Sequence, residues 1–488
     1  MMVIHPLVIP FILGLLTSRV LLRKSRMPHP LVFSLAIALP LGLALCSLIL
    51  FWSYVLASPQ AKRLSILTAG FLSLIFLGLN IKNGLLPEIR HWGQNLVSKI
   101  LALSDCFNPQ KHALKDRLKY ALTILGGILF LYLVFHYSRY FLGYVSWNIY
   151  GGWDAQFFWN LKAKFYFRDP VQWRGMFSSL LDWAHPDYPL LIPGAVAWGW
   201  NFTGKEFLLW PPVIDFVFFL SLCFIVVWYL GSHVSWLSGF LAGSFLITLP
   251  MYRFWSTTQY VDIPLCFFFT TSILILLSAL RTREAILYLY AGLLAGISTW
   301  TKNEGLFFIV WITMPLILTL VLDRNIGGSQ KRKFIFCFFS GMMIAFSATL
   351  FAKFSLGLQG GEYLGSGRRA ADYLSALFFK NERAEVIAQS FLIFKLNHEQ
   401  WNGLWILFLT AVLLSGRRGY QNYRWILIIT IFLIEFGYFV VLHWSPAEIR
   451  FQISVSLLRL MMHTGVLALI YTFEGLGPVW HPHENRRI

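Results

Sequence analysis

The sequence predicts an all-α polytopic membrane protein with about 13 transmembrane helices. Apolar residues make up 57% of the 488 residues and charged residues only 13%, and a soluble core of this size could not bury that much apolar surface. Aromatic residues reach 17%, which suits aromatic belts at the two membrane surfaces. The net charge of +18 comes from Lys and Arg between apolar runs, so it indicates cytoplasmic loops and no nucleic-acid partner.

The individual helices follow from the lengths of the apolar runs. A helix crosses the hydrocarbon core with about 20 residues, or about 17 at the short end. The runs that meet or approach this length are 3–22, 30–56, 63–81, 118–142, 207–230, 237–251, 261–280, 285–301, 305–322, 333–356, 401–416, 424–443 and 450–473.

One further apolar stretch, residues 188–202, is too short to assign by length. It contains Pro189 and Pro193, and its roughly 15 residues would reach only about 22 Å as a helix. If it does not cross, several later basic clusters fall on the same side as the basic loop 19–26, which favours a re-entrant or interfacial segment. These clusters are Arg281/Arg283, Arg324 with Lys331–Lys333, Arg417/Arg418/Arg424 and Arg486/Arg487.

The resulting topology places the N-terminus outside and the C-terminus in the cytoplasm. It divides the chain into a three-span module, 1–117, whose cytoplasmic loop holds an amphipathic helix near 85–101, a central module, 118–322, with the outer loop 143–206, and a C-terminal module, 323–488, with the outer loop 357–400. A second amphipathic helix is predicted at 380–394, lying on the membrane.

Four polar segments fall on the outer face in this topology. They are Gly151-Gly152-Trp153-Asp154, His185-Pro186-Asp187-Tyr188-Pro189, Tyr260-Val261-Asp262-Ile263-Pro264 and Thr301-Lys302-Asn303-Glu304-Gly305. Each has an ordinary structural interpretation as a helix N-cap, a turn, an interface residue or a tight connection. Together they place Asp154, Asp262, Lys302 and Glu304 near one face of the membrane.

This pattern resembles the lipid-linked-sugar glycosyltransferases with the GT-C fold, near the protein O-mannosyltransferases and the lipid A aminoarabinose transferases. GGWDAQFFWNLKAK stands where that family has an acidic motif, HPDYPLL where it has a His-Pro-Pro-Leu-like motif, and TKNEGL where it has a Thr-Lys-Gly-Pro-like turn. The likeness covers about 118–322 in order, and the C-terminal third only loosely. The chain departs at Asp187, Asn303 and Glu304, and it has one acid in the first motif.

The resemblance implies a GT-C-like helical bundle in a bacterial inner or plasma membrane, with interfacial helices in the first outer loop. The donor would be a polyprenyl-phosphate-linked sugar, and the acceptor a lipid, glycan or protein hydroxyl on the outer face. Asp154 would be the general base, with Asp262 as the other candidate carboxylate. Lys302, Arg450, Arg368 and Arg369 would bind the donor phosphate, and His185, Asp187, Glu304 and Arg459 would contact substrate. No Cys or His spacing indicates a metal site, and no cofactor is indicated, so metal dependence stays open.

Two ionisable residues, Glu435 and Arg459, fall deep within apolar runs. They would lie about 12 Å and 13.5 Å below the outer end of two antiparallel helices, counting 1.5 Å per residue. Equal depth favours a buried ion pair between them, and the alternative is that Arg459 reaches the donor phosphate. Gln452, Ser456, Arg459 and His463 form one helical stripe, which we expect to face the protein interior.

Two other functions fit parts of the pattern. A polymerase or ligase that uses lipid-diphosphate donors would place its key arginines in a late outer loop. Arg368 and Arg369 fit this description. A transporter or flippase would favour inverted repeats and helices broken in matched halves, which the sequence does not contain.

Overall fold

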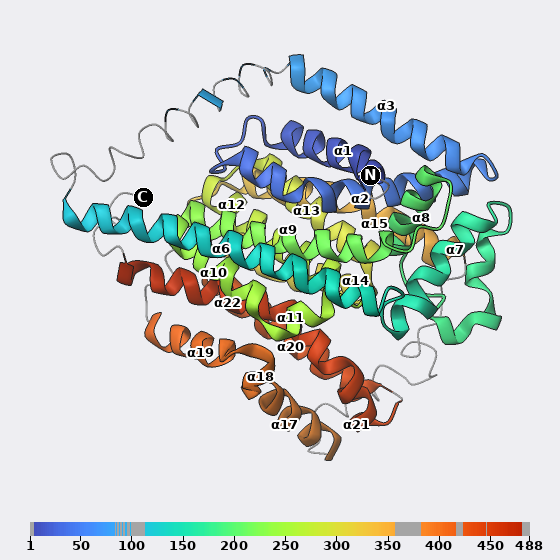
Figure 1. Cartoon of the computed structure of the whole chain (residues 1–488). Coiled ribbons are helices and arrows are strands. Elements are labelled where there is room, and N and C mark those ends of the chain that lie inside the picture. The colour runs from blue at the N-terminus through green and yellow to red at the C-terminus, as the bar shows by residue number, and fades with distance from the viewer. Residues whose placement is uncertain are drawn as a thin grey trace.

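The computed structural model describes residues 4–82, 113–356, 382–415, 423–445 and 447–480, with isolated positions between 84 and 98. Its regular structure in these ranges is entirely helical, which confirms the all-α class (Figure 1). Ten helices in these ranges are long and apolar enough to cross a membrane. They are α1 (His5–Leu22), α2 (Pro30–Ala57), α3 (Ala61–Lys82), α6 (Leu114–Trp147), α9 (Trp210–His233), α12 (Asp262–Thr282), α14 (Glu304–Leu322), α15 (Gly328–Ser355), α20 (Trp425–Trp444) and the continuous unit Ile449–Gly475.

Three shorter apolar helices coincide with the remaining predicted crossings. They are α10 (Trp236–Thr248), α13 (Ala285–Thr301) and α19 (Leu404–Ser415). The structure therefore describes a multi-pass membrane protein, and the count of 13 crossings stays a prediction.

Helix α12 lies at the centre of the bundle. Every residue from Asp262 to Leu280 is buried, because α9, α13 and α22 (Leu458–Trp480) surround it. Glycines allow some of the neighbouring helices to touch backbone to backbone. A Cβ at Gly292 of α13 would lie 1.9 Å from the Phe338 carbonyl oxygen of α15, and a Cβ at Gly341 would lie 1.9 Å from that of Leu289. Small residues at such positions are a common means of close helix packing in membranes.

The first two helices pack into the same bundle. The Ser47 hydroxyl of α2 donates to the Leu190 carbonyl at 3.1 Å and accepts from the Trp300 indole at 3.2 Å. The Trp198 indole donates to the Pro6 carbonyl of α1 at 3.4 Å. Helices α1 and α2 of the predicted N-terminal module thus share buried surface with the central module.

Short helices of the predicted first outer loop, 143–206, gather at one end of the bundle, called the α7 end below (Figure 1). They are η1 (Ala155–Trp159), α7 (Asn160–Arg168), η2 (Trp173–Phe177), η3 (Ser179–Ala184) and α8 (Leu191–Thr203). Helix α8 covers the stretch 188–202 that length could not assign. It has 13 residues, is not among the ten spanning helices, and packs against α1, α2, α7 and α9.

Segments predicted to be cytoplasmic meet at the opposite end. Glu284 accepts hydrogen bonds from the Ser25 hydroxyl at 2.7 Å and the Arg26 backbone at 2.9 Å, and Arg283 pairs with Asp323 at 3.3 Å. If the chain crosses the membrane in alternating directions, the connections that hold these residues must lie at the same end of the bundle. Which end faces the cytoplasm stays a prediction.

The predicted surface helix 380–394 is α17 (Glu382–Leu396), followed by α18 (His398–Trp401). Arg383 caps the C-terminal end of α20 by donating to the carbonyls of Leu442, Ser445 and Ala447. Leu392 and Ile393 remain exposed. Most of the predicted helix near 85–101 and most of the loop 357–400 lie outside the described residues.

Candidate functional site

A tight turn between α11 (Pro250–Trp255) and α12 holds the first outer loop against the bundle. Gln259 has a left-handed backbone with φ of 61°, and its side chain donates to the Ile149 carbonyl at 2.9 Å and accepts from Asn160 at 3.0 Å. The Gly152 backbone donates to the Thr258 carbonyl at 2.9 Å. A Cβ at Gly151 would lie 2.6 Å from that oxygen, so this close approach needs glycine.

The turn brings Asp154, at the head of η1, to Arg459 of α22. The Arg459 Nη1 lies 2.6 Å from Asp154 Oδ2 and 3.6 Å from Asp262 Oδ2. The guanidinium also lies over the rings of Trp255 and Tyr260, at 5.5 and 5.1 Å from their centroids. The Asp154 side chain makes no N-cap hydrogen bond, so its partner is the arginine and not the start of its own helix.

Both members of this pair adjoin an irregular helical turn. Asp154 directly precedes the π-helical turn η1, and Arg459 follows the π-helical turn η5 (Ile453–Leu457) by two residues. Such turns are rare and frequently occur at functional sites, because the extra residue redirects the neighbouring side chains.

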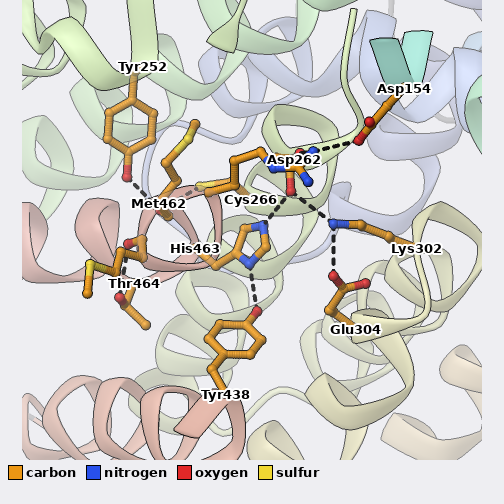
Figure 2. Close-up of polar contacts among 12 residues, drawn as sticks. Asp154, Tyr252, Asp262, Cys266, Lys302, Glu304, Tyr438, Met462, His463 and Thr464 are labelled. Atoms are coloured by element: carbon orange, nitrogen blue, oxygen red, sulfur yellow. Dashed lines mark hydrogen bonds and ion pairs between the residues drawn. The ribbon is translucent and has the colours of Figure 1, made fainter. Parts of the chain in front are cut away.

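The network continues from Asp262 to the connection between α13 and α14. The Lys302 Nζ lies 3.1 Å from Asp262 Oδ1 and 2.8 Å from Glu304 Oε1 (Figure 2). Burial by itself would lower the pKa of Lys302, but the two carboxylates outweigh it and raise this pKa above its usual value. A Cβ at Gly305 would lie 2.0 Å from the Ser298 carbonyl oxygen, so glycine lets α14 start directly beside the end of α13.

A histidine from α22 completes the surroundings of Asp262. The His463 Nε2 lies 3.7 Å from Asp262 Oδ1, and its Nδ1 forms a 2.6 Å hydrogen bond with the Tyr438 hydroxyl of α20 (Figure 2). The Met462 carbonyl beside it accepts hydrogen bonds from the Tyr252 hydroxyl at 2.5 Å and the Cys266 thiol at 3.4 Å. These bonds hold α22 against α11 and α12, with His463 fully buried as the predicted stripe requires.

The predicted Glu435–Arg459 ion pair is wrong. Glu435 pairs with Lys395 of α17 and accepts a hydrogen bond from the Thr464 hydroxyl at 3.0 Å. Thr464 is five residues from Arg459, which is about 140° around an α-helix, so the two side chains leave α22 in different directions. Thr464 also lies about 7.5 Å farther along the helix axis than Arg459, so Glu435 is not level with the arginine. Arg459 instead faces Asp154 and Asp262.

Asp187 and His185 lie beside the network and not within it. Asp187 Oδ2 accepts from the Asn303 Nδ2 at 2.6 Å, next in sequence to Lys302. The His185 ring packs on Phe158 and Tyr188, with centroids 4.8 and 4.7 Å away.

Other predicted phosphate ligands lie apart or outside the described residues. Arg450, in α21 (Ile449–Gln452), is exposed, and no ion pair joins it to the network within the described residues. Arg368 and Arg369 lie outside those residues. Among the described residues, no group of three His, Cys, Asp or Glu side chains could hold a metal ion.

Three polar residues near the site, two of them buried, were not predicted. Asp215 of α9 is 1% exposed and lies beside the backbone of Gln259 and Tyr260, in the turn before α12. Lys353 of α15 contacts Asn303, and Lys162 of α7 lies under the loop that carries Asp187. An ionisable residue inside an apolar run is a signal that could have found Asp215 and Lys353.

Comparisons of the chain with family models, curated proteins and solved structures found no match. The functional assignment therefore depends on the motifs and on the geometry of the site. That geometry brings two cations, Lys302 and Arg459, and three carboxylates, Asp154, Asp262 and Glu304, into one network at the α7 end. Such a site can accept a proton at a carboxylate and can stabilise an anionic leaving group.

Proposed function

We propose that this protein is an integral-membrane glycosyltransferase of the GT-C type, with 13 crossings and its site on the outer face of a bacterial inner or plasma membrane. It moves a sugar from a polyprenyl-phosphate donor to the hydroxyl group of a lipid, glycan or protein acceptor. The observation that supports this function best is the network in which Arg459 links Asp154 to Asp262 and Lys302 links Asp262 to Glu304.

The carboxylates of the network differ in their exposure to solvent, and this difference suggests different roles. The Asp262 side chain is 0% exposed, whereas those of Asp154 and Glu304 are 18% and 21% exposed. Asp262 contacts both cations and therefore anchors Arg459 and Lys302 in place. Asp154 and Glu304 form the edge that a substrate reaches first. Ionisable groups buried in this way are costly and cluster at functional sites.

The proposed reaction is a single displacement at the anomeric carbon. The acceptor oxygen forms the new bond to that carbon while its proton passes to Asp154, and the bond from carbon to the phosphate oxygen breaks. The polyprenyl phosphate leaves with the electron pair, and Arg459 and Lys302 stabilise its negative charge. One base is sufficient, and the configuration of the sugar is inverted.

Donor binding would also prepare the base. Asp154 Oδ2 is bound to Arg459 Nη1, while its Oδ1 has no hydrogen-bond partner within the described residues. A donor phosphate near Arg459 competes with Asp154 for the guanidinium, and its arrival releases the carboxylate to accept a proton. Asp262, at 3.6 Å, keeps Arg459 oriented during this exchange.

Incubation of the purified protein with a labelled polyprenyl-monophosphate sugar and a membrane extract as acceptor source tests this function. Consumption of the monophosphate donor is the expected result. Consumption of a lipid-diphosphate donor alone would indicate the polymerase or ligase, and consumption of neither would contradict a transferase.

The Asp154→Asn variant tests the assigned base in the same assay. It keeps the shape of the side chain, and transfer should fall at least about a hundredfold while the donor still binds. The matched control is Asp182→Asn, an exposed acid in the same loop, which should leave transfer unchanged. Full transfer by Asp154→Asn would eliminate Asp154 as the base and favour Asp262.

A further inference from the structure

The connection that carries Lys302 is held from outside by two side chains, from two other segments, that bind Asn303 of the connection. Asn303 Nδ2 donates to Asp187 Oδ2 at 2.6 Å, and the Lys353 Nζ donates to Asn303 Oδ1 at 3.0 Å. The same Nζ donates to the Asp187 backbone carbonyl at 3.2 Å, which closes a ring of three contacts. Asp187 is only 6% exposed.

The loop that presents Asp187 is itself fixed. The buried Lys162 Nζ donates to the carbonyls of His185 and Tyr188 at 2.5 and 3.3 Å. The Tyr188 backbone donates to the His185 carbonyl at 3.0 Å, and their rings stack with an interplanar angle of 9°. Asp187 therefore projects from a rigid turn, as a positioning residue requires.

We propose that Asp187, Asn303 and Lys353 form a clamp that positions Lys302. Only Lys302 and Asn303 connect α13 to α14, so fixing the Asn303 side chain fixes the backbone from which Lys302 reaches Asp262 and Glu304. Asp187 is then a positioning residue, in place of the substrate contact that the sequence predicted. The consequence of the clamp for donor binding depends on the proposed glycosyltransferase function, whereas its effect on the geometry of Lys302 does not.

Exchange of the two clamp residues tests this role. In Asn303→Asp, two carboxylates face each other and the clamp opens. In Asp187→Asn with Asn303→Asp, the new amide donates to the new carboxylate, which also accepts from Lys353, and the clamp closes again. Lys353→Met opens it without adding a negative charge.

The first measurement is acylation of Lys302 by an amine-reactive ester, followed by mass spectrometry of the peptide. The Lys302 side chain is 8% exposed in the closed clamp, and exposed Lys205 serves as the internal control. Loss of a hydrogen bond to a charged group should raise the acylation of Lys302 about tenfold in Asn303→Asp and in Lys353→Met. The exchanged double variant should regain the protection of the parent. Unchanged protection in both opened variants, or no recovery on exchange, would overturn the clamp.

The second measurement is transfer from the monophosphate donor, resolved into kcat and KM. We expect a raised donor KM in the opened variants and recovery in the exchanged variant. Recovered protection without recovered transfer would show that Asp187 contacts substrate, and would overturn its assignment as a positioning residue. Absence of transfer in the parent chain would refute the proposed function, while the acylation results would still decide whether the clamp exists.

Discussion

Asp154→Asn and Arg459→Gln should cost less stability together than the sum of their separate costs, because each single variant strands the other partner. The two side chains are 18% and 14% exposed, and their atoms are 2.6 Å apart. Hydrogen bonds to charged groups contribute about 1.5–3 kcal/mol, so we expect a coupling energy in this range. Asp262 retains Lys302 at 3.1 Å, which should keep the cost of Arg459→Gln below the upper end of about 3–5 kcal/mol for a stranded buried charge.

Glu435 provides two matched controls for this cycle. Glu435→Gln combined with Arg459→Gln should be additive within about 0.3–0.5 kcal/mol, because these side chains do not share a contact. Glu435→Gln combined with Lys395→Gln should show a coupling energy instead, since Lys395 is the ion-pair partner of Glu435. Lys395 also lies 4.5 Å from the centroid of the Trp405 ring.

The assay is reversible unfolding in mixed micelles, with the free energy of unfolding measured for each single and double variant. Coupling between Glu435 and Arg459, together with additivity between Asp154 and Arg459, would refute the reasoning. That outcome would restore the ion pair predicted from equal depth and would separate Arg459 from the site.

Three further predictions concern the site, the topology and the buried lysine of α7. Lys302→Ala should weaken donor binding and Lys302→Arg should retain part of it, because lysine and arginine can both contact a phosphate but differ in geometry. Unchanged donor affinity in the alanine variant would mean that Lys302 is only a turn residue. Single cysteines at exposed Gln172 and Ser329, in a background without native thiols, should be labelled from opposite sides of the membrane, and labelling from one side would contradict the topology. Burial lowers the pKa of Lys162 to about 7, so the folded chain binds this proton more weakly than the unfolded chain, and stability should rise as the pH increases above about 7. Thermal unfolding of Lys162→Met should lack this rise, and an identical pH profile for parent and variant would contradict the shift.

The helices could be predicted from the sequence because the length and composition of an apolar run are local properties. The predicted runs 261–280 and 424–443, for example, correspond to α12 and α20 within two residues at each end. The grouping of Asp154, Asp262, Lys302 and Glu304 also followed from the sequence. When the chain crosses repeatedly, the ends of successive helices alternate between the two sides. Counting the crossings puts all four of these residues at helix ends on the same side.

The partners of each side chain could not be predicted in this way. Residue counting gives the depth of Glu435 and Arg459 along their helices, but the direction in which each side chain points depends on how the helices rotate and pack. The structure turns Arg459 toward Asp154, and it brings Lys395 from a separate helix to Glu435.

The sequence by itself determined the all-α membrane class, the position of the apolar helices and the gathering of Asp154, Asp262, Lys302 and Glu304 at one end of the bundle. Only the tertiary structure decided that Asp187 binds Asn303, that Lys353 joins them, and that His463 lies between Asp262 and Tyr438. The reason is that periodicity and length act along one chain segment, whereas these contacts join residues from different helices. Their geometry depends on close packing of side chains that lie far apart in the sequence.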